Sequence, residues 1–299
     1  MTIDDAATLK AKQGEISDYW TSHPMIFPGL DWQNSSPEEI FAFMDQQIRE
    51  KAPWYHKPGE GLFSALIDYP ALAGKKVLEI GFGTGKMAYE LVKVGAEFHG
   101  VDLSKTHKAL CDHRFAGETN VDFRLASGAD LPFEDEYFDF AISWGVIMHA
   151  EDDLACFREF YRTLKPGGRA FLMLYRKGGI KYYYQKLFKQ GILQLGLLKH
   201  GFNVASFINS VTDKYSKNSP GAPISRHYTE IDVRRIFLNY EEVDIRIEGG
   251  LYDFSNIPFR ILPISDWILG QDARIKLGQK YGGFWLIDLK KPERKEKSA

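Results

Sequence analysis

A glycine-rich turn follows a short apolar run, and this spacing indicates a loop that approaches a ligand closely. The run 77–80 is typical of a buried strand, and the segment 86–94 beyond the turn has apolar residues at helical spacing. Glycine lacks a Cβ, so the backbone between strand and helix can meet a flat or charged ligand. The acidic Glu79 lies two residues before the first of three alternating glycines, which are Gly81, Gly83 and Gly85.

A second acidic residue lies where a bound nucleoside would need it. The run 97–102 is typical of another buried strand and ends in Asp102, roughly 20 residues past the first glycine. A carboxylate at that place can accept hydrogen bonds from two ribose hydroxyls. The alternative is that Asp102 caps the next helix, but Ser104 is the better cap candidate. The pattern therefore predicts a ligand that carries an adenosine, and Leu103 is expected to line the adenine.

A dinucleotide is one ligand that such a turn can hold. Its usual fingerprint has a third glycine three residues after the second. Here Lys86 occupies that place. A nicotinamide dinucleotide is therefore the less favoured ligand, and an NAD(P)-dependent oxidoreductase stays an alternative.

Later segments extend the pattern in order along the chain. They are the Leu-Pro-Phe segment 127–133, the strand-like run 138–143 leading into Trp144 and Gly145, and the Lys-Pro-Gly-Gly turn 165–168. With the glycine turn and Asp102, they resemble the class I S-adenosylmethionine (SAM)-dependent methyltransferases. The resemblance covers about residues 75–175. It is nearest to the branch of ubiquinone and menaquinone C-methyltransferases and natural-product enzymes.

The resemblance implies a SAM site built from the turn and the ends of further strands. In the family the acid of the turn faces the cationic methionine end of SAM, which assigns that role to Glu79. The family's Asp that holds the adenine amino group is Ser127 here, and a serine oxygen or nearby backbone groups can still bind adenine. The residues expected to bind SAM are Glu79, Gly81, Phe82, Gly83, Gly85, Asp102, Leu103, Ser127, Gly128, Ala129, Trp144 and Gly145.

Histidines, tyrosines and one arginine are candidates for the acceptor side. His149 follows the fourth strand and can act as a general base, since imidazole titrates near neutrality, or it can hold its loop. Arg226 can pair a carboxylate or phosphate of the substrate, or tie its loop to the core. The catalytic candidates are His149, His227 and Tyr19, and the substrate-binding candidates are Trp20, Tyr175, Arg226 and Tyr228.

The expected fold class is α/β. The resemblance implies a Rossmann-like seven-stranded sheet, mostly parallel with the last strand antiparallel, with helices on both faces and an added substrate lid. We expect an N-terminal helical lid over 1–70 and the methyltransferase domain over 71–299, with insertions at about 176–222 and about 249–282. The first insertion is apolar and rich in lysine, so it can be a cap over the substrate, a solvated surface helix or a membrane-surface helix.

Composition argues against other function classes. The chain has 299 residues and a formal net charge of −2, so no overall field favours nucleic acid or an anionic membrane. Its two cysteines lack metal-ligand spacing and favour a reduced, cytoplasmic compartment; no metal is expected. No apolar run approaches the roughly 20 residues of a transmembrane span, and peripheral membrane contact is the less favoured reading of the lysine-rich insertion. The oligomeric state is left open.

These observations predict methyl transfer from SAM to a small-molecule acceptor, on oxygen, nitrogen or carbon. Aromatic-rich flanks favour a partly apolar acceptor, of secondary metabolism or of a quinone- or lipid-like pathway. A base is needed for a phenol or enol, whereas an amine needs only desolvation. A SAM-binding protein without catalysis is the other alternative.

Overall fold

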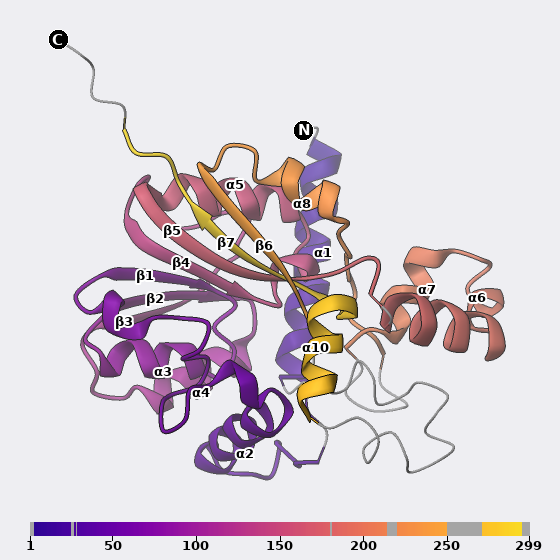
Figure 1. The fold of residues 1–299 in the computed structure, drawn as a ribbon, viewed down its shortest axis with the longest axis horizontal. Coiled ribbons are helices and arrows are strands. Elements are labelled where there is room, and N and C mark those ends of the chain that lie inside the picture. Colours follow the sequence, from indigo (N-terminus) through magenta and orange to yellow (C-terminus); the bar gives the residue numbers. More distant parts are fainter. Residues whose placement is uncertain are drawn as a thin grey trace.

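A mixed β-sheet forms the centre of the computed structural model, which describes residues 3–24, 27, 29–179, 181–213, 220–249 and 271–294. In these residues the sheet has seven strands in the order β3-β2-β1-β4-β5-β7-β6 (Figure 1). The strands are β1 (Lys76–Ile80), β2 (Glu97–Asp102), β3 (Val121–Leu125), β4 (Phe138–Trp144), β5 (Leu164–Tyr175), β6 (Glu242–Glu248) and β7 (Phe284–Lys290). β1 to β5 pair in parallel, and β7 runs antiparallel to β5 and β6. The predicted fold class is confirmed.

Burial along the strands explains their sequence patterns. Val77, Leu78 and Ile80 of the inner strand β1 are buried on both faces of the sheet, as continuous apolar runs of parallel strands require. The edge strand β6 instead alternates between exposed and half-buried side chains over most of its length. The packed core therefore fixes β1 and its neighbours, and with them the carboxyl ends of the strands.

Helices lie on both sides of the sheet (Figure 1). They are α1 (Ile3–Ser22), α2 (Pro37–Lys51), α3 (Lys86–Lys93), α4 (Lys105–Arg114), α5 (Asp153–Thr163), α6 (Gly196–Lys199), α7 (Val204–Val211), α8 (Glu230–Ile236), α10 (Gln271–Tyr281) and a π-helix (Lys181–Leu193). Ser104 caps α4, because its Oγ accepts a hydrogen bond from the backbone N–H of His107 at 3.2 Å. The cap role is thus taken by Ser104, as expected. No described helix is long and apolar enough to cross a bilayer.

Helix α1 lies across the carboxyl end of β2. The Ser17 hydroxyl donates to the carbonyl oxygen of Leu103 at 2.7 Å, and the Ser104 hydroxyl donates to the carbonyl oxygen of Trp20 at 3.0 Å. These two bonds hold the end of α1 against the loop after β2. The division into a lid over 1–70 and a domain over 71–299 stays a prediction.

The segment between β5 and α8 carries a small core of its own. Tyr182, Phe207 and Ile208 are buried there and pack with Leu187, Leu197 and Val211. In Figure 1 helices α6 and α7 stand to one side of the sheet. Most of the second predicted insertion, 249–282, lies outside the described residues; within it, α10 packs against β6.

Candidate functional site

A cavity of about 640 Å³ opens at the carboxyl ends of the parallel strands. Its wall includes the residues that directly follow or end five strands: Gly81, Asp102, Ala126, Trp144 and Tyr175. This is the edge of an open α/β sheet where ligands bind. The volume lies in the range of small-molecule sites, about 300–1,000 Å³.

The glycine turn forms the floor of the cavity. Gly81 has a φ of +82°, and a Cβ placed on it would lie 2.2 Å from the side chain of Val146. Gly83 has a φ of +53°, lines the cavity, and a Cβ there would meet no atom within 4 Å. The turn thus needs glycine both for its backbone conformation and for close packing against the loop after β4.

Asp102 is an ionised acceptor beside this turn. Its Oδ2 accepts a hydrogen bond from the N–H of Gly83 at 3.1 Å and lies 3.2 Å from His107 Nδ1, while its Oδ1 accepts from the N–H of Ser104 at 2.9 Å. Burial alone would raise the pKa of Asp102, but the charge and hydrogen bond of His107 keep it below the ordinary value. A carboxylate offers about four acceptor positions, so one remains for a ligand hydroxyl. Sequence reasoning missed His107.

Two ionisable side chains, Glu79 and Lys86, lie beside the turn without a hydrogen bond between them. Glu79 is 2% exposed, and its Oε2 has no hydrogen-bond partner. Burial, with a contribution from Asp102, raises the pKa of Glu79 to about 8, although Lys86 opposes the rise. Lys86 lines the cavity, and burial lowers its pKa. Among the described residues, no hydrogen bond or ion pair engages the Lys86 ammonium, so a zwitterionic ligand would satisfy both groups.

A second buried carboxylate lies beyond β4. The Ser127 hydroxyl donates to Glu151 Oε1 at 2.5 Å and accepts from the N–H of Ala129 at 3.0 Å. Glu151 lines the cavity, and its Oε2 is buried without a hydrogen-bond partner. Ser127 and Glu151 therefore bring a hydroxyl and a carboxylate to the same corner of the cavity. No local motif marks Glu151.

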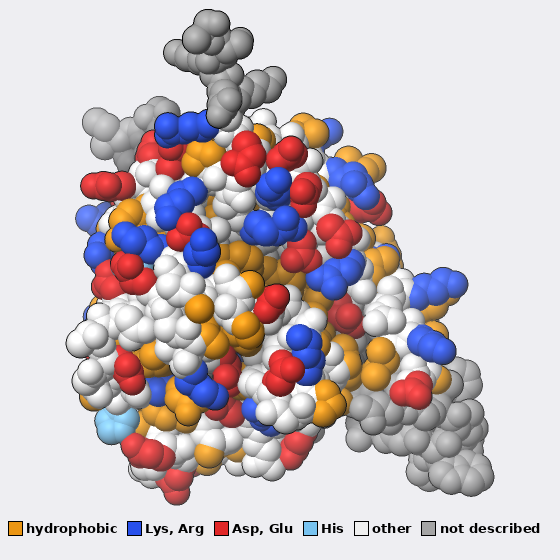
Figure 2. All heavy atoms as spheres, turned by 60° about the vertical axis from the view of Figure 1, so that its left-hand side comes forward, with side chains coloured by type: hydrophobic (Ala, Val, Ile, Leu, Met, Phe, Trp, Pro, Cys, Tyr) orange, Lys and Arg blue, Asp and Glu red, His pale blue; other side chains and the backbone are white. Residues whose placement is uncertain are grey.

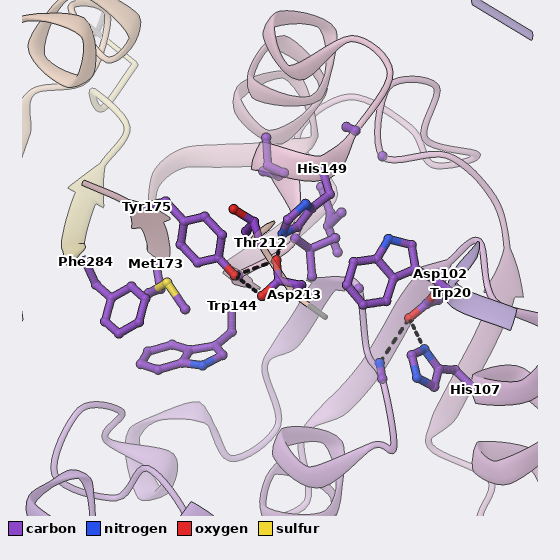
Figure 3. A pocket seen from close by; sticks show the side chains of 18 of the residues that line it. Trp20, Asp102, His107, Trp144, His149, Met173, Tyr175, Thr212, Asp213 and Phe284 are labelled. Atoms are coloured by element: carbon purple, nitrogen blue, oxygen red, sulfur yellow. Dashed lines mark hydrogen bonds and ion pairs between the residues drawn. The ribbon is translucent and has the colours of Figure 1, made fainter. Parts of the chain in front are cut away.

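Aromatic side chains line the other end of the cavity. Figure 3 shows Asp102 and His107 on one side and Trp144, Met173, Tyr175 and Phe284 on the other. The indole of Trp20, from α1, packs edge-on against the His149 ring with centroids 5.4 Å apart. The cavity therefore has a polar end over β1 and β2 and an aromatic end over β4 and β5.

His149 and Asp213 form a pair in this cavity (Figure 3). His149 Nδ1 lies 2.6 Å from the carbonyl oxygen of Ile224, which assigns the proton to that nitrogen, and Nε2 lies 3.1 Å from Asp213 Oδ2. Burial would raise the pKa of Asp213, but the hydrogen bond and charge of His149 and the charge of Lys186 lower it to about 2. The Tyr175 hydroxyl donates to the Asp213 carboxylate at 2.9 Å. Asp213 thus places a carboxylate beside His149 Nε2.

His227 and Tyr19 have environments that disfavour proton transfer. His227 lines the cavity, yet burial and the charge of Lys186, whose Nζ lies 3.2 Å from Nε2, lower its pKa to about 3. The hydroxyl of Tyr19 donates to the carbonyl oxygen of Asp213 at 2.6 Å, and burial together with Asp213 raises its pKa to about 12. Tyr19 therefore holds Asp213 in place from outside the cavity lining.

Several predicted site residues lie outside the cavity lining. Arg226 donates to the carbonyl oxygens of Ala150 and Glu151 at 2.5 and 3.1 Å, so it ties its loop to the core. The Tyr228 hydroxyl donates to Asp153 at 2.7 Å. The predicted residues that line the cavity are Trp20, Gly81, Gly83, Asp102, Leu103, Ser127, Gly128, Trp144, Gly145, His149, Tyr175 and His227; those that do not are Tyr19, Glu79, Phe82, Gly85, Ala129, Arg226 and Tyr228.

Comparison with known proteins covers the centre of the chain. Residues 78–172 match a family model described as a methyltransferase domain. Phosphoethanolamine N-methyltransferase 2 of Caenorhabditis elegans is 33% identical over 108 residues, 35% of this chain and 25% of that protein. A ubiquinone biosynthesis O-methyltransferase of Xanthomonas oryzae pv. oryzae is 33% identical over 122 residues, 39% of this chain and 51% of that protein. The matches thus span about a quarter to half the length of these relatives.

Solved structures agree on the fold. A SAM-dependent methyltransferase from Methanosarcina mazei superposes with a TM-score of 0.53 at 18% identity, over 79% of this chain and 100% of the other. Part of a Haloferax volcanii complex, between the Trm112 methyltransferase activator and a methyltransferase, superposes with the same TM-score at 16% identity, over 86% of this chain and 97% of that chain. The family match and the sheet order agree: residues 78–172 match a methyltransferase domain, on a fold that is shared with SAM-dependent methyltransferases of solved structure.

Proposed function

We propose that the protein transfers a methyl group from SAM to a small-molecule acceptor. The observation that carries the proposal is one cavity with two unlike ends: ionised Asp102 beside the glycine turn, and an aromatic chamber beyond it. The first suits an adenosine and the second a partly apolar acceptor. Both ends open on the same edge of the sheet, so one bound molecule can reach the other.

The polar end fits the three parts of SAM. Asp102 would accept a hydrogen bond from one ribose hydroxyl through its remaining acceptor position. The Oε2 of Glu79 lacks a hydrogen-bond partner, and Lys86 is a cation beside the same turn, which supports binding of the amino and carboxylate groups of the methionine part. The orphan oxygen of Glu151 would accept the adenine amino group. These buried polar atoms would otherwise remain unsatisfied, which is costly in a folded protein.

When bound, SAM supplies a methyl group activated by a sulfonium cation. The chain's own part is to align the acceptor, exclude water and take up a proton. Trp20 and Trp144 border the middle of the cavity and shield it. His149 Nε2 would receive the proton of an acceptor hydroxyl, and the Asp213 carboxylate stabilises the resulting imidazolium. This pair supports an acceptor that loses a proton, such as a phenol or enol.

The acceptor class follows from the aromatic end. Met173, Tyr175 and Phe284 offer apolar and aromatic surface for a ring-bearing or lipid-like molecule. The curated relatives are named for phosphoethanolamine and for ubiquinone biosynthesis, and the aromatic side chains favour the second. We therefore expect a phenolic or quinone-like acceptor, methylated on oxygen or carbon.

Calorimetry and a methylation assay test the proposal together. We expect SAM and S-adenosylhomocysteine (SAH) to bind and NAD not to bind. Incubation with methyl-labelled SAM and a panel of phenols and hydroquinones should then yield a labelled product, at a rate that falls in His149→Ala. Tight SAM binding with no labelled product across the panel would favour a SAM-binding protein without catalysis. Binding of NAD without SAM would refute the proposal and favour the oxidoreductase alternative.

A further inference from the structure

Exposed apolar side chains gather in one part of the molecule. Among the described residues, eight of the fourteen exposed large apolar side chains fall within 183–204. They are Tyr183, Phe188, Ile192, Leu193, Leu195, Leu198, Phe202 and Val204. This stretch runs from the π-helix through α6 to the start of α7, beside the sheet in Figure 1. Such a concentration on a soluble surface marks a site of interaction.

The most exposed of these side chains, such as Leu193 and Phe202, take no part in the small core of this stretch. Its own core is made by other residues, among them Tyr182 and Phe207, which are 8% and 1% exposed. Leu193 is 63% and Phe202 is 69% exposed. The outward apolar residues are therefore available to a partner without unpacking the segment.

Charge identifies the partner. Residues 176–212 hold six Lys and Arg and no Asp or Glu, in a chain whose net charge is −2. The six are Arg176, Lys177, Lys181, Lys186, Lys189 and Lys199. Of these, Lys177 and Lys199 are exposed, whereas Lys186 is buried in the cavity and Arg176 donates to the carbonyl oxygen of Gly282. On the face seen in Figure 2, by contrast, positive and negative side chains are interspersed. Apolar side chains flanked by cations of one sign complement an anionic lipid surface, where acyl chains meet negative headgroups.

We propose that residues 183–204 dock on an anionic phospholipid surface. The apolar side chains enter the headgroup region, and exposed cations such as Lys177 and Lys199 contact the headgroups. The contact is peripheral, because no described helix could span a bilayer. Tyr182 and Lys186 of the same segment line the cavity beside Tyr175 and His227. Under the proposed function, docking would bring the acceptor end of the cavity to a source of lipid-like acceptors; docking itself needs no methyl transfer.

Vesicle flotation of the full chain tests the docking directly. The probes are vesicles of phosphatidylcholine alone and of phosphatidylcholine mixed with phosphatidylglycerol. The test variant is Ile192→Asp with Leu193→Asp. The control is Ile231→Asp with Leu238→Asp, which changes two exposed apolar residues in α8 and just after it. A charge variant, Lys177→Gln with Lys199→Gln, is compared with Lys57→Gln. Thermal melting and SAH binding confirm that each variant is folded.

We expect the wild type and the α8 control to float with the mixed vesicles but not with phosphatidylcholine. The Ile192 and Leu193 variant should remain in solution, and each charge removed at Lys177 and Lys199 should lower partitioning about fivefold. The proposal would be overturned if the wild type failed to float or bound both vesicle types equally. It would also be overturned if the α8 control lost flotation as much as the Ile192 and Leu193 variant. A further contradicting result would be a wild-type dimer that binds no vesicles and that Leu193→Asp dissociates, because a second copy of the chain would then cover the surface. None of these outcomes depends on whether methyl transfer is observed.

Discussion

Replacing Glu79 by glutamine should uncouple SAH binding from pH. In the free protein, burial raises the pKa of Glu79 to about 8, so the carboxyl holds a proton at neutral pH. An ammonium group bound beside it favours the ionised form. Binding of the amino-acid end of SAH therefore expels this proton, and affinity rises with pH until Glu79 is already ionised.

The size of the effect follows from linkage. For a group with a free pKa of about 8 and a bound pKa well below 6, the affinity rises about ninefold from pH 6 to 7 and about fivefold from pH 7 to 8. The total is roughly 50-fold, or about 2.3 kcal/mol. At pH 7, close to one proton should leave per SAH bound.

Isothermal titration calorimetry measures both quantities. Titrations of SAH at several pH values give the change of its affinity with pH. Titrations in buffers of different ionisation enthalpy give the number of protons released on binding. Glu79→Gln should bind more weakly at pH 8 and lose most of the pH slope; any slope that remains belongs to other groups, such as His107. Equal proton release in wild type and Glu79→Gln would refute the assignment of Glu79 to the ligand's ammonium.

Stability of the ligand-free protein provides an independent check with a defined sign. The pKa of Glu79 is raised in the folded state, so its contribution is fully present below the unfolded pKa and is lost as pH rises through about 8. The free energy of unfolding of Glu79→Gln should therefore exceed that of wild type increasingly between about pH 5 and pH 8. A parallel pair of stability curves would contradict the raised pKa.

Four other substitutions test separate parts of the site. Asp102→Ala should weaken SAH binding by about 1–3 kcal/mol in calorimetry, and unchanged affinity would remove the ribose assignment. Glu151→Ala should cost a similar amount for SAH, about 1–3 kcal/mol, but nothing for an analogue whose purine lacks the exocyclic amino group; equal losses would mean a general disturbance. His149→Ala should keep the Kd for SAH and lower kcat by about 10²–10⁴, whereas full activity would make it a loop residue. Gly81→Ala should abolish SAH binding and lower the melting temperature, because its Cβ would meet Val146; a normal melting curve would contradict that contact.

The local signals in the sequence predicted the sheet and the polar end of the cavity. The apolar run before Gly81, the acid at position 102 and the cap at Ser104 each depend on neighbours in the chain. Their structural consequences therefore follow from spacing alone. The number of strands and the antiparallel direction of the last strand came from the family resemblance rather than from any of these runs.

Contacts between distant segments account for what the sequence could not predict. Asp213 meets His149 only because the loop after α7 returns to the end of β4, and no motif surrounds it. Glu151 reaches Ser127 across 24 residues. From the sequence, Arg226 could pair with the substrate or tie its loop to the core. In the structure it binds the carbonyl groups of the loop after β4. Such placements depend on tertiary packing that residue spacing does not encode.

A crystal structure of the protein with SAH tests the central claim most directly. We predict that the ribose hydroxyls lie on Asp102, that the adenine amino group meets Glu151, and that the sulfur faces the chamber of Trp144, Tyr175 and His149. SAH bound away from the glycine turn, or a turn whose cavity accepts no SAH at saturating concentration, would contradict the claim.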